Sequence, residues 1–196
     1  MNTLPDFVVL DTCVLLSNVL RRLFLRLAHK GCFAPVWSEV IGDEWRRNAA
    51  RLWEVAPEAI ALQWEEMQAE FPEANRGDVS AFKQGLVHSD PKDWHVIAAG
   101  RAVLAKHPEA SVAVVTRNLR DFRRSELRRV GLALLDPDQL LVLCREPYRP
   151  ELEAALEQVP QDLVDVGRPL EPLEAILKRD RLFRLARLSS NSVALS

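Results

Sequence analysis

The sequence lacks the features that mark several classes of protein. Only three of its 196 residues are cysteines (Cys13, Cys32 and Cys144), and no two of them form a Cys-x-x-Cys pair. This pattern argues against a disulfide framework and against a zinc site. The chain also has no apolar run long enough to cross a membrane and no signal-peptide pattern at its start. We therefore expect a cytoplasmic protein in a reducing compartment.

The chain also has little net charge, with a formal value of -2. This total does not indicate a nucleic-acid-binding protein, so the distribution of the charges matters more than their sum. Residues 117–129 are strongly basic and contain only two acids, Asp121 and Glu126. This segment is either a solvated helix face or a surface that contacts phosphate. Its arginines are Arg117, Arg120, Arg123, Arg124, Arg128 and Arg129.

Short apolar segments alternate along the chain with stretches whose apolar residues fall at helical spacing. This alternation predicts an α/β fold with three layers, α/β/α, around a mostly parallel central sheet. Pro35 indicates an edge strand or the start of a strand, since proline cannot donate a hydrogen bond to a neighbouring strand. The expected strands are residues 6–11, 33–37, 112–116 and 132–135.

The composition changes after residue 146, which divides the chain into an α/β domain at 1–146 and a helical extension at 147–196. Residues 151–174 are acidic, whereas residues 178–187 carry a basic stripe. The favoured interpretation is that these helices cover the domain. The alternatives are that the extension docks on a partner or a second copy, or that its basic stripe contacts RNA.

Four carboxylates lie at the end of a predicted strand or near the start of a predicted helix. In an α/β sheet such element ends converge at one edge, where ligands bind. Carboxylate oxygens suit Mg²⁺ or Mn²⁺ better than zinc. Because crowded carboxylates repel one another, the cluster makes most sense around a divalent cation. The four acids are Asp11, Glu44, Asp93 and Asp121.

The same acids also have structural interpretations. Asp11 could cap the helix that follows it, and Glu44 suits the first turns of a helix. Asp90 is expected to cap the helix that begins at Pro91, or else to support the metal ligands, and Asp93 could complete a capping box with it. Asp121 could instead pair with a neighbouring arginine, Arg117 or Arg124.

The sequence resembles the PIN-domain ribonucleases in four pieces that occur in the family's order. These pieces are Val9–Ser17, Ser38–Glu44, Asp90–Ala99 and Val115–Phe122. The resemblance implies that residues 1–146 form a PIN-like nuclease domain and that Asp11, Glu44, Asp93 and Asp121 are its metal-binding and catalytic acids. It also implies that Thr116 and Asn118 orient a ligand or a water. Cys13 departs from the family, which usually has asparagine there.

The resemblance further implies a metal-dependent endoribonuclease that uses Mg²⁺ or Mn²⁺. Arg117, Arg120, Arg123 and Arg124 would then contact RNA. Similar proteins are often VapC-like toxins of bacterial toxin–antitoxin pairs, which implies an antitoxin partner and often a homodimer, with no membrane association. Two alternatives remain: a binding module on an inactive PIN fold, and a haloacid-dehalogenase-like phosphatase. The phosphatase chemistry needs a second aspartate where this chain has Cys13.

Overall fold

The computed structural model describes residues 3–193, with side chains described for residues 3–189. Its centre is a four-stranded parallel sheet in the order β2-β1-β3-β4. The strands are shorter than the sequence predicts by one or two residues, apart from the last, because the flanking residues turn away into loops. They are β1 (Phe7–Leu10), β2 (Ala34–Val36), β3 (Val112–Val115) and β4 (Leu132–Leu135).

The two inner strands are almost entirely apolar, as expected when helices cover both faces of a parallel sheet. Pairing places Leu10 opposite Val115, so β1 and β3 end side by side. The strand with Pro35 is an edge strand, because β2 pairs only with β1; this is the first of the two positions that Pro35 indicates. The α/β class and the parallel sheet are therefore confirmed.

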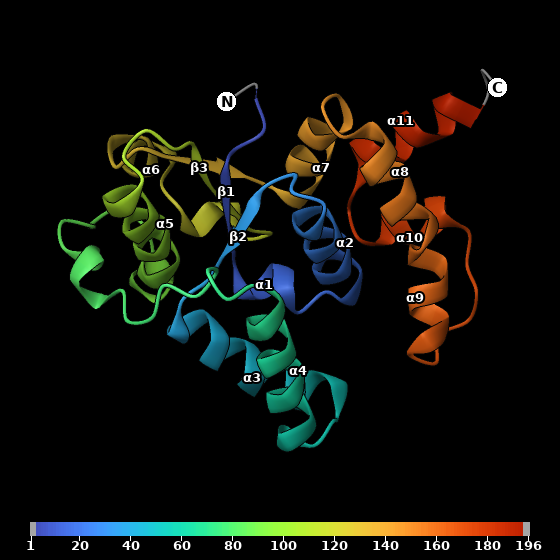
Figure 1. Ribbon diagram of the computed structural model, residues 1–196, viewed down its shortest axis with the longest axis horizontal. Helices are drawn as coiled ribbons and strands as arrows, with labels where there is room; N and C mark the ends of the chain where they lie inside the picture. Colours follow the sequence, from blue (N-terminus) through green and yellow to red (C-terminus); the bar gives the residue numbers. More distant parts are fainter. Residues whose placement is uncertain (1–2, 194–196) are drawn as a thin grey trace.

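Helices lie on both sides of the sheet (Figure 1). Helix α5 packs on β1, β3 and β4, while α2 lies on the opposite side and contacts β2. Helices α3 and α4 pack together as an arm beside the sheet. The helices of the first 146 residues are α1 (Thr12–Leu15), α2 (Asn18–His29), α3 (Glu39–Trp53), α4 (Pro57–Glu70), α5 (Trp94–Lys106), α6 (Arg124–Arg129) and α7 (Pro137–Arg145), with short 3-10 turns η1 (Ser80–Lys83), η2 (Pro91–Asp93) and η3 (Leu119–Asp121).

Four further helices follow residue 146 within the residues that the structure describes. Helices α8 and α9 pack against α2, and α11 packs against α7. Their apolar residues, such as Leu156, Ile176 and Leu185, join the same hydrophobic core as the sheet. Their bounds are α8 (Arg149–Glu157), α9 (Val159–Asp165), α10 (Leu173–Arg179) and α11 (Phe183–Val193). In the described part of the chain, no helix is both long enough and apolar enough to span a membrane.

Candidate metal centre

The crevice between the ends of β1 and β3 is the point where the direction of the sheet reverses. From β1 the chain crosses to β2 on one side, and from β3 it crosses to β4 on the other. Ligands of open parallel sheets bind outside the strand ends at such a reversal. Asp11 follows β1 and Thr116 follows β3, and the Thr116 hydroxyl donates to Asp11 Oδ2 at 2.6 Å. Both residues are buried, so this bond ties the two strand ends together.

Cys13 supplies a second donor to the same carboxylate. Its Sγ lies 3.0 Å from Asp11 Oδ2, and it accepts from the backbone N–H of Arg117 at 3.3 Å. Burial, followed by the charge of Asp11, raises the pKa of this thiol to about 12. The thiol therefore stays protonated and acts as a neutral donor. Asp11 occupies the position before α1, but its side chain makes no capping bond, so the capping interpretation of Asp11 is wrong.

Three carboxylates gather beside this crevice. Asp90, Asp93 and Asp121 each offer one oxygen, and these oxygens lie within 4.8 Å of one another. All three residues are half-buried. Burial, followed by the charges of Asp11 and Asp121, raises the pKa of Asp93 to about 6. Asp11 is thus close enough to act on Asp93, and the trio of residues 90, 93 and 121 could hold a metal ion.

Two loops bring the trio together, because the backbone N–H of Asp90 donates to the Asp121 carbonyl at 2.8 Å. The Asp90 side chain caps the η2 turn by accepting from Lys92 N at 3.0 Å, as predicted. Asp93 makes no side-chain capping bond, so it does not complete a capping box. The Asn118 side-chain amide donates to the Asp121 carboxylate, which agrees with an orienting role for Asn118.

Asp121 also does not form the arginine pairs that were the alternative. Arg117 donates to the Asp180 carbonyl at 3.0 Å, and Arg124 donates to the Leu134 carbonyl at 2.9 Å. Both guanidinium groups are therefore partly engaged by the protein itself. Arg120 and Arg123, which were also expected to bind RNA, are exposed.

Glu44 is not part of the trio. Its carboxylate accepts from the Thr12 hydroxyl at 3.0 Å and lies 3.4 Å from Nε2 of the buried His95. Burial alone would raise the pKa of Glu44, but His95 and Thr12 outweigh it and lower the pKa. Of the four predicted ligands, the structure therefore joins Asp93 and Asp121, places Asp11 within electrostatic reach of Asp93, and engages Glu44 with His95.

A buried glutamate that the sequence did not single out fixes one of these loops. Glu126 is 1% exposed and accepts from the backbone N–H groups of Val87 at 2.7 Å, His88 at 3.1 Å and Ser89 at 2.8 Å. Burial alone would raise its pKa, but these donors lower it to about 2. The residue after this loop is Asp90, so Glu126 helps to position the trio. The basic residues around Glu126 suggested a solvated helix face, and no local pattern indicated its burial.

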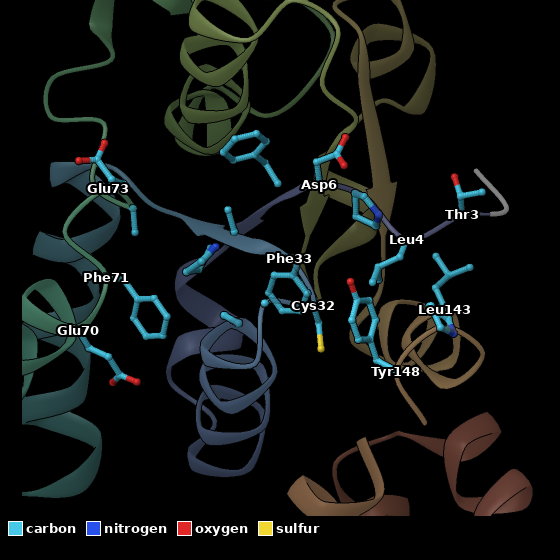
Figure 2. A pocket seen from close by; sticks show the side chains of 18 of the residues that line it. Thr3, Leu4, Asp6, Cys32, Phe33, Glu70, Phe71, Glu73, Leu143 and Tyr148 are labelled. Carbon is cyan, nitrogen blue, oxygen red and sulfur yellow. The ribbon is translucent and has the colours of Figure 1, made fainter. Parts of the chain in front are cut away.

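A separate cavity of about 1060 Å³ lies at the other end of the strands. The segments that lead into β1 and β2 line it, together with Phe71 and Tyr148 (Figure 2). Its lining is mostly apolar and includes none of the predicted site residues. The carboxylates at the opposite edge are the stronger candidate, because they carry groups capable of chemistry.

No known family model, curated protein or solved structure matches the chain.

Proposed function

We propose that the chain is a metal-dependent endoribonuclease, with a PIN-like domain that hydrolyses RNA phosphodiester bonds. The observation that supports this most is the trio of carboxylates within 4.8 Å beside the bonded pair Asp11 and Thr116. Crowded acids at a strand-end crevice are costly unless a cation neutralises them. The resemblance to PIN-domain ribonucleases supports RNA as the substrate.

The donor set fits Mg²⁺ or Mn²⁺. Asp90, Asp93 and Asp121 offer hard oxygen atoms, which these ions prefer, and such ions keep other positions for water and phosphate oxygens. The nearby Cys13 thiol is bonded to Asp11 and is not one of the three residues whose ligand atoms gather. When bound, the ion would polarise the phosphate and lower the pKa of a bound water.

The other side chains of the site would then orient the carboxylates, act on the water and contact the RNA. Thr116 and Cys13 hold the orientation of Asp11, and Asn118 holds that of Asp121. The Asp93 carboxylate would align the attacking water or accept its proton. The exposed Arg120 and Arg123 would contact phosphates of the RNA.

The proposal extends to a toxin role with an antitoxin partner, which the family resemblance alone supports. A haloacid-dehalogenase-like phosphatase is disfavoured because the position two residues after Asp11 carries a thiol instead of a second carboxyl. A binding module on an inactive fold would bind RNA without cleaving it, so an activity assay distinguishes this alternative from a ribonuclease.

The test is cleavage of single-stranded RNA with Mg²⁺, with Mn²⁺ and with EDTA. We expect Asp93→Asn to lower the rate about 100-fold, because it removes a ligand and a proton acceptor. Glu157→Gln, which changes an exposed carboxylate on α8, is the matched control and should cleave normally. Equal activity in Asp93→Asn and wild type, or activity that persists in EDTA, would overturn the proposal.

A further inference from the structure

The turn between α10 and α11 is anchored at the same edge of the sheet as the acids. The Ser17 hydroxyl, which follows α1, donates to the Asp180 carboxylate at 2.9 Å. Arg117, which follows Thr116, donates to the Asp180 carbonyl at 3.0 Å. The backbone N–H of Arg117 in turn bonds the Cys13 thiol that touches Asp11. A continuous chain of contacts therefore joins this turn to the candidate metal centre.

A cavity of about 320 Å³ lies where this turn meets the ends of β3 and β4. The turn contributes Arg181, Phe183 and Arg184 to its lining. The two other segments contribute Arg117 and Pro137, among others. A pocket between basic and aromatic side chains at this edge is a candidate for binding part of an extended substrate.

Three arginines and three acids line this cavity, and they differ in how far the protein itself engages them. Its acids already have donors: Asp138 accepts from the N–H groups of Arg184 at 2.8 Å and Leu185 at 3.0 Å, and Asp136 accepts from Gln139 at 2.7 Å. The third acid, Asp180, bonds Ser17 as described. The guanidinium groups of Arg181 and Arg184, in contrast, have no partner among the described residues and are exposed. These two guanidinium groups can therefore meet a phosphate without giving up a protein partner.

The turn also presents an aromatic ring to solvent. Phe183 is 56% exposed, whereas its neighbours Leu182 and Leu185 are 1% exposed and fix the turn in the core. Arg181 has a φ of 61°, a left-handed conformation that is unusual outside glycine. Exposed aromatics beside arginines are the combination that binds single-stranded nucleic acid, since bases stack on the ring and phosphates meet the cations.

We propose that residues 180–184 form a nucleotide-binding subsite for single-stranded RNA. Phe183 stacks on a base, and Arg181 and Arg184 contact the phosphates beside it. The subsite gives the C-terminal extension a direct part in holding substrate. Its role in catalysis rests on the proposed ribonuclease function, whereas its binding of RNA can be measured without cleavage.

The test measures fluorescence anisotropy of a labelled single-stranded oligouridylate with the full chain in EDTA, where no cleavage occurs. Phe183→Ala should weaken binding about tenfold, and Phe183→Trp should restore it, because stacking is worth about 1–3 kcal/mol per base. Leu62→Ala is the matched control, since Leu62 is also an exposed apolar residue (57%) but lies on α4. It should bind RNA as the wild type does.

A second variant, Arg181→Gly, separates binding from folding. Glycine tolerates the left-handed backbone, so this variant should melt at or above the wild-type temperature. It should nevertheless bind RNA more weakly and lower the slope of log affinity against log salt by about 1. Lys30→Ala, which removes an exposed cation at the end of α2, should keep the affinity at low salt.

The outcomes distinguish the two proposals. Equal RNA affinity in wild type, Phe183→Ala and Arg181→Gly would overturn the subsite, even if the wild type cleaves RNA. Absence of cleavage with binding that still depends on Phe183 would overturn the ribonuclease proposal and keep the subsite.

Discussion

Glu126 and Asp93 lie in neighbouring segments at the same edge of the sheet, yet their surroundings are opposite. Glu126 accepts three backbone N–H groups, and its pKa is lowered to about 2. Asp93 is surrounded by other carboxylates, and burial together with their charges raises its pKa to about 6. A carboxylate with matched donors stabilises the fold, whereas one among like charges destabilises it until a proton or a cation arrives. Glu126 therefore stabilises a loop of the site, whereas Asp93 becomes stable only when a proton or a cation is bound.

The largest expected effect is that of Glu126→Gln, which replaces a charged acceptor of three backbone N–H groups with a neutral one. Ionised Glu126 should stabilise the fold by about 3 kcal/mol, because its pKa lies near 2 and not at its ordinary 4.5. A depressed folded-state pKa gives stability that is present above the unfolded-state pKa and is lost as the pH falls towards 2. Chemical denaturation should show a large deficit for this variant at pH 7 and a much smaller one near pH 2.

Glu126→Gln should also weaken Mn²⁺ binding about tenfold, because the loop it fixes leads to Asp90. Asp138→Asn is the matched control, because Asp138 is another buried carboxylate that accepts backbone N–H groups. It lies on α7, and its donors, Arg184 and Leu185, lie at the start of α11. This control should lose stability and keep its Mn²⁺ affinity. If both variants lose affinity equally, the effect is general destabilisation and not positioning.

Asp93→Asn should change the stability of the metal-free protein in the opposite direction from Glu126→Gln. Because the pKa of Asp93 is raised, ionisation destabilises the metal-free fold as the pH rises through about 6. Without metal, we expect the variant to be more stable than wild type by about 1–2 kcal/mol at pH 8, after allowing for solvent screening of a half-buried group. The two proteins should be equally stable at pH 3.5. Thermal melts in EDTA at both values measure this, and a destabilised variant at pH 8 would contradict it.

The smallest expected effect concerns Cys13. Cys13→Ala removes one donor from Asp11 and should cost about 1 kcal/mol, while Thr116 retains the other bond. Cys13→Ser keeps a donor and should lose less. Urea denaturation compares the two, and a serine variant as unstable as the alanine variant would argue against the hydrogen bond.

The sequence predicted the parts of the fold that depend on local pattern. Apolar runs mark buried strands wherever they occur, so β1 and β3 and the polar residues that end them, Asp11 and Thr116, could be placed. Pro35 limited β2 to an edge strand or placed the proline at a strand start, because proline lacks a backbone N–H, and β2 is an edge strand. Each of these inferences needs only neighbouring residues.

The rest depends on contacts between distant segments. Glu126 bonds a loop 37 to 39 residues away, and its own neighbours indicate a solvated helix. Glu44 was expected with the other acids, but the buried His95 lies against it, and no spacing rule predicts that. Asp180 meets Ser17 across 163 residues, so a docked C-terminal turn could not be predicted from composition.

The most direct test of the account is calorimetric titration of Mn²⁺ into the metal-free protein at pH 7.5. The account predicts saturable binding that Asp93→Asn and Asp121→Asn each weaken at least about tenfold, while Glu157→Gln binds like the wild type. Wild-type protein that takes up no Mn²⁺, or aspartate variants that bind it as tightly as the wild type, would contradict the claim that these carboxylates enclose a cation.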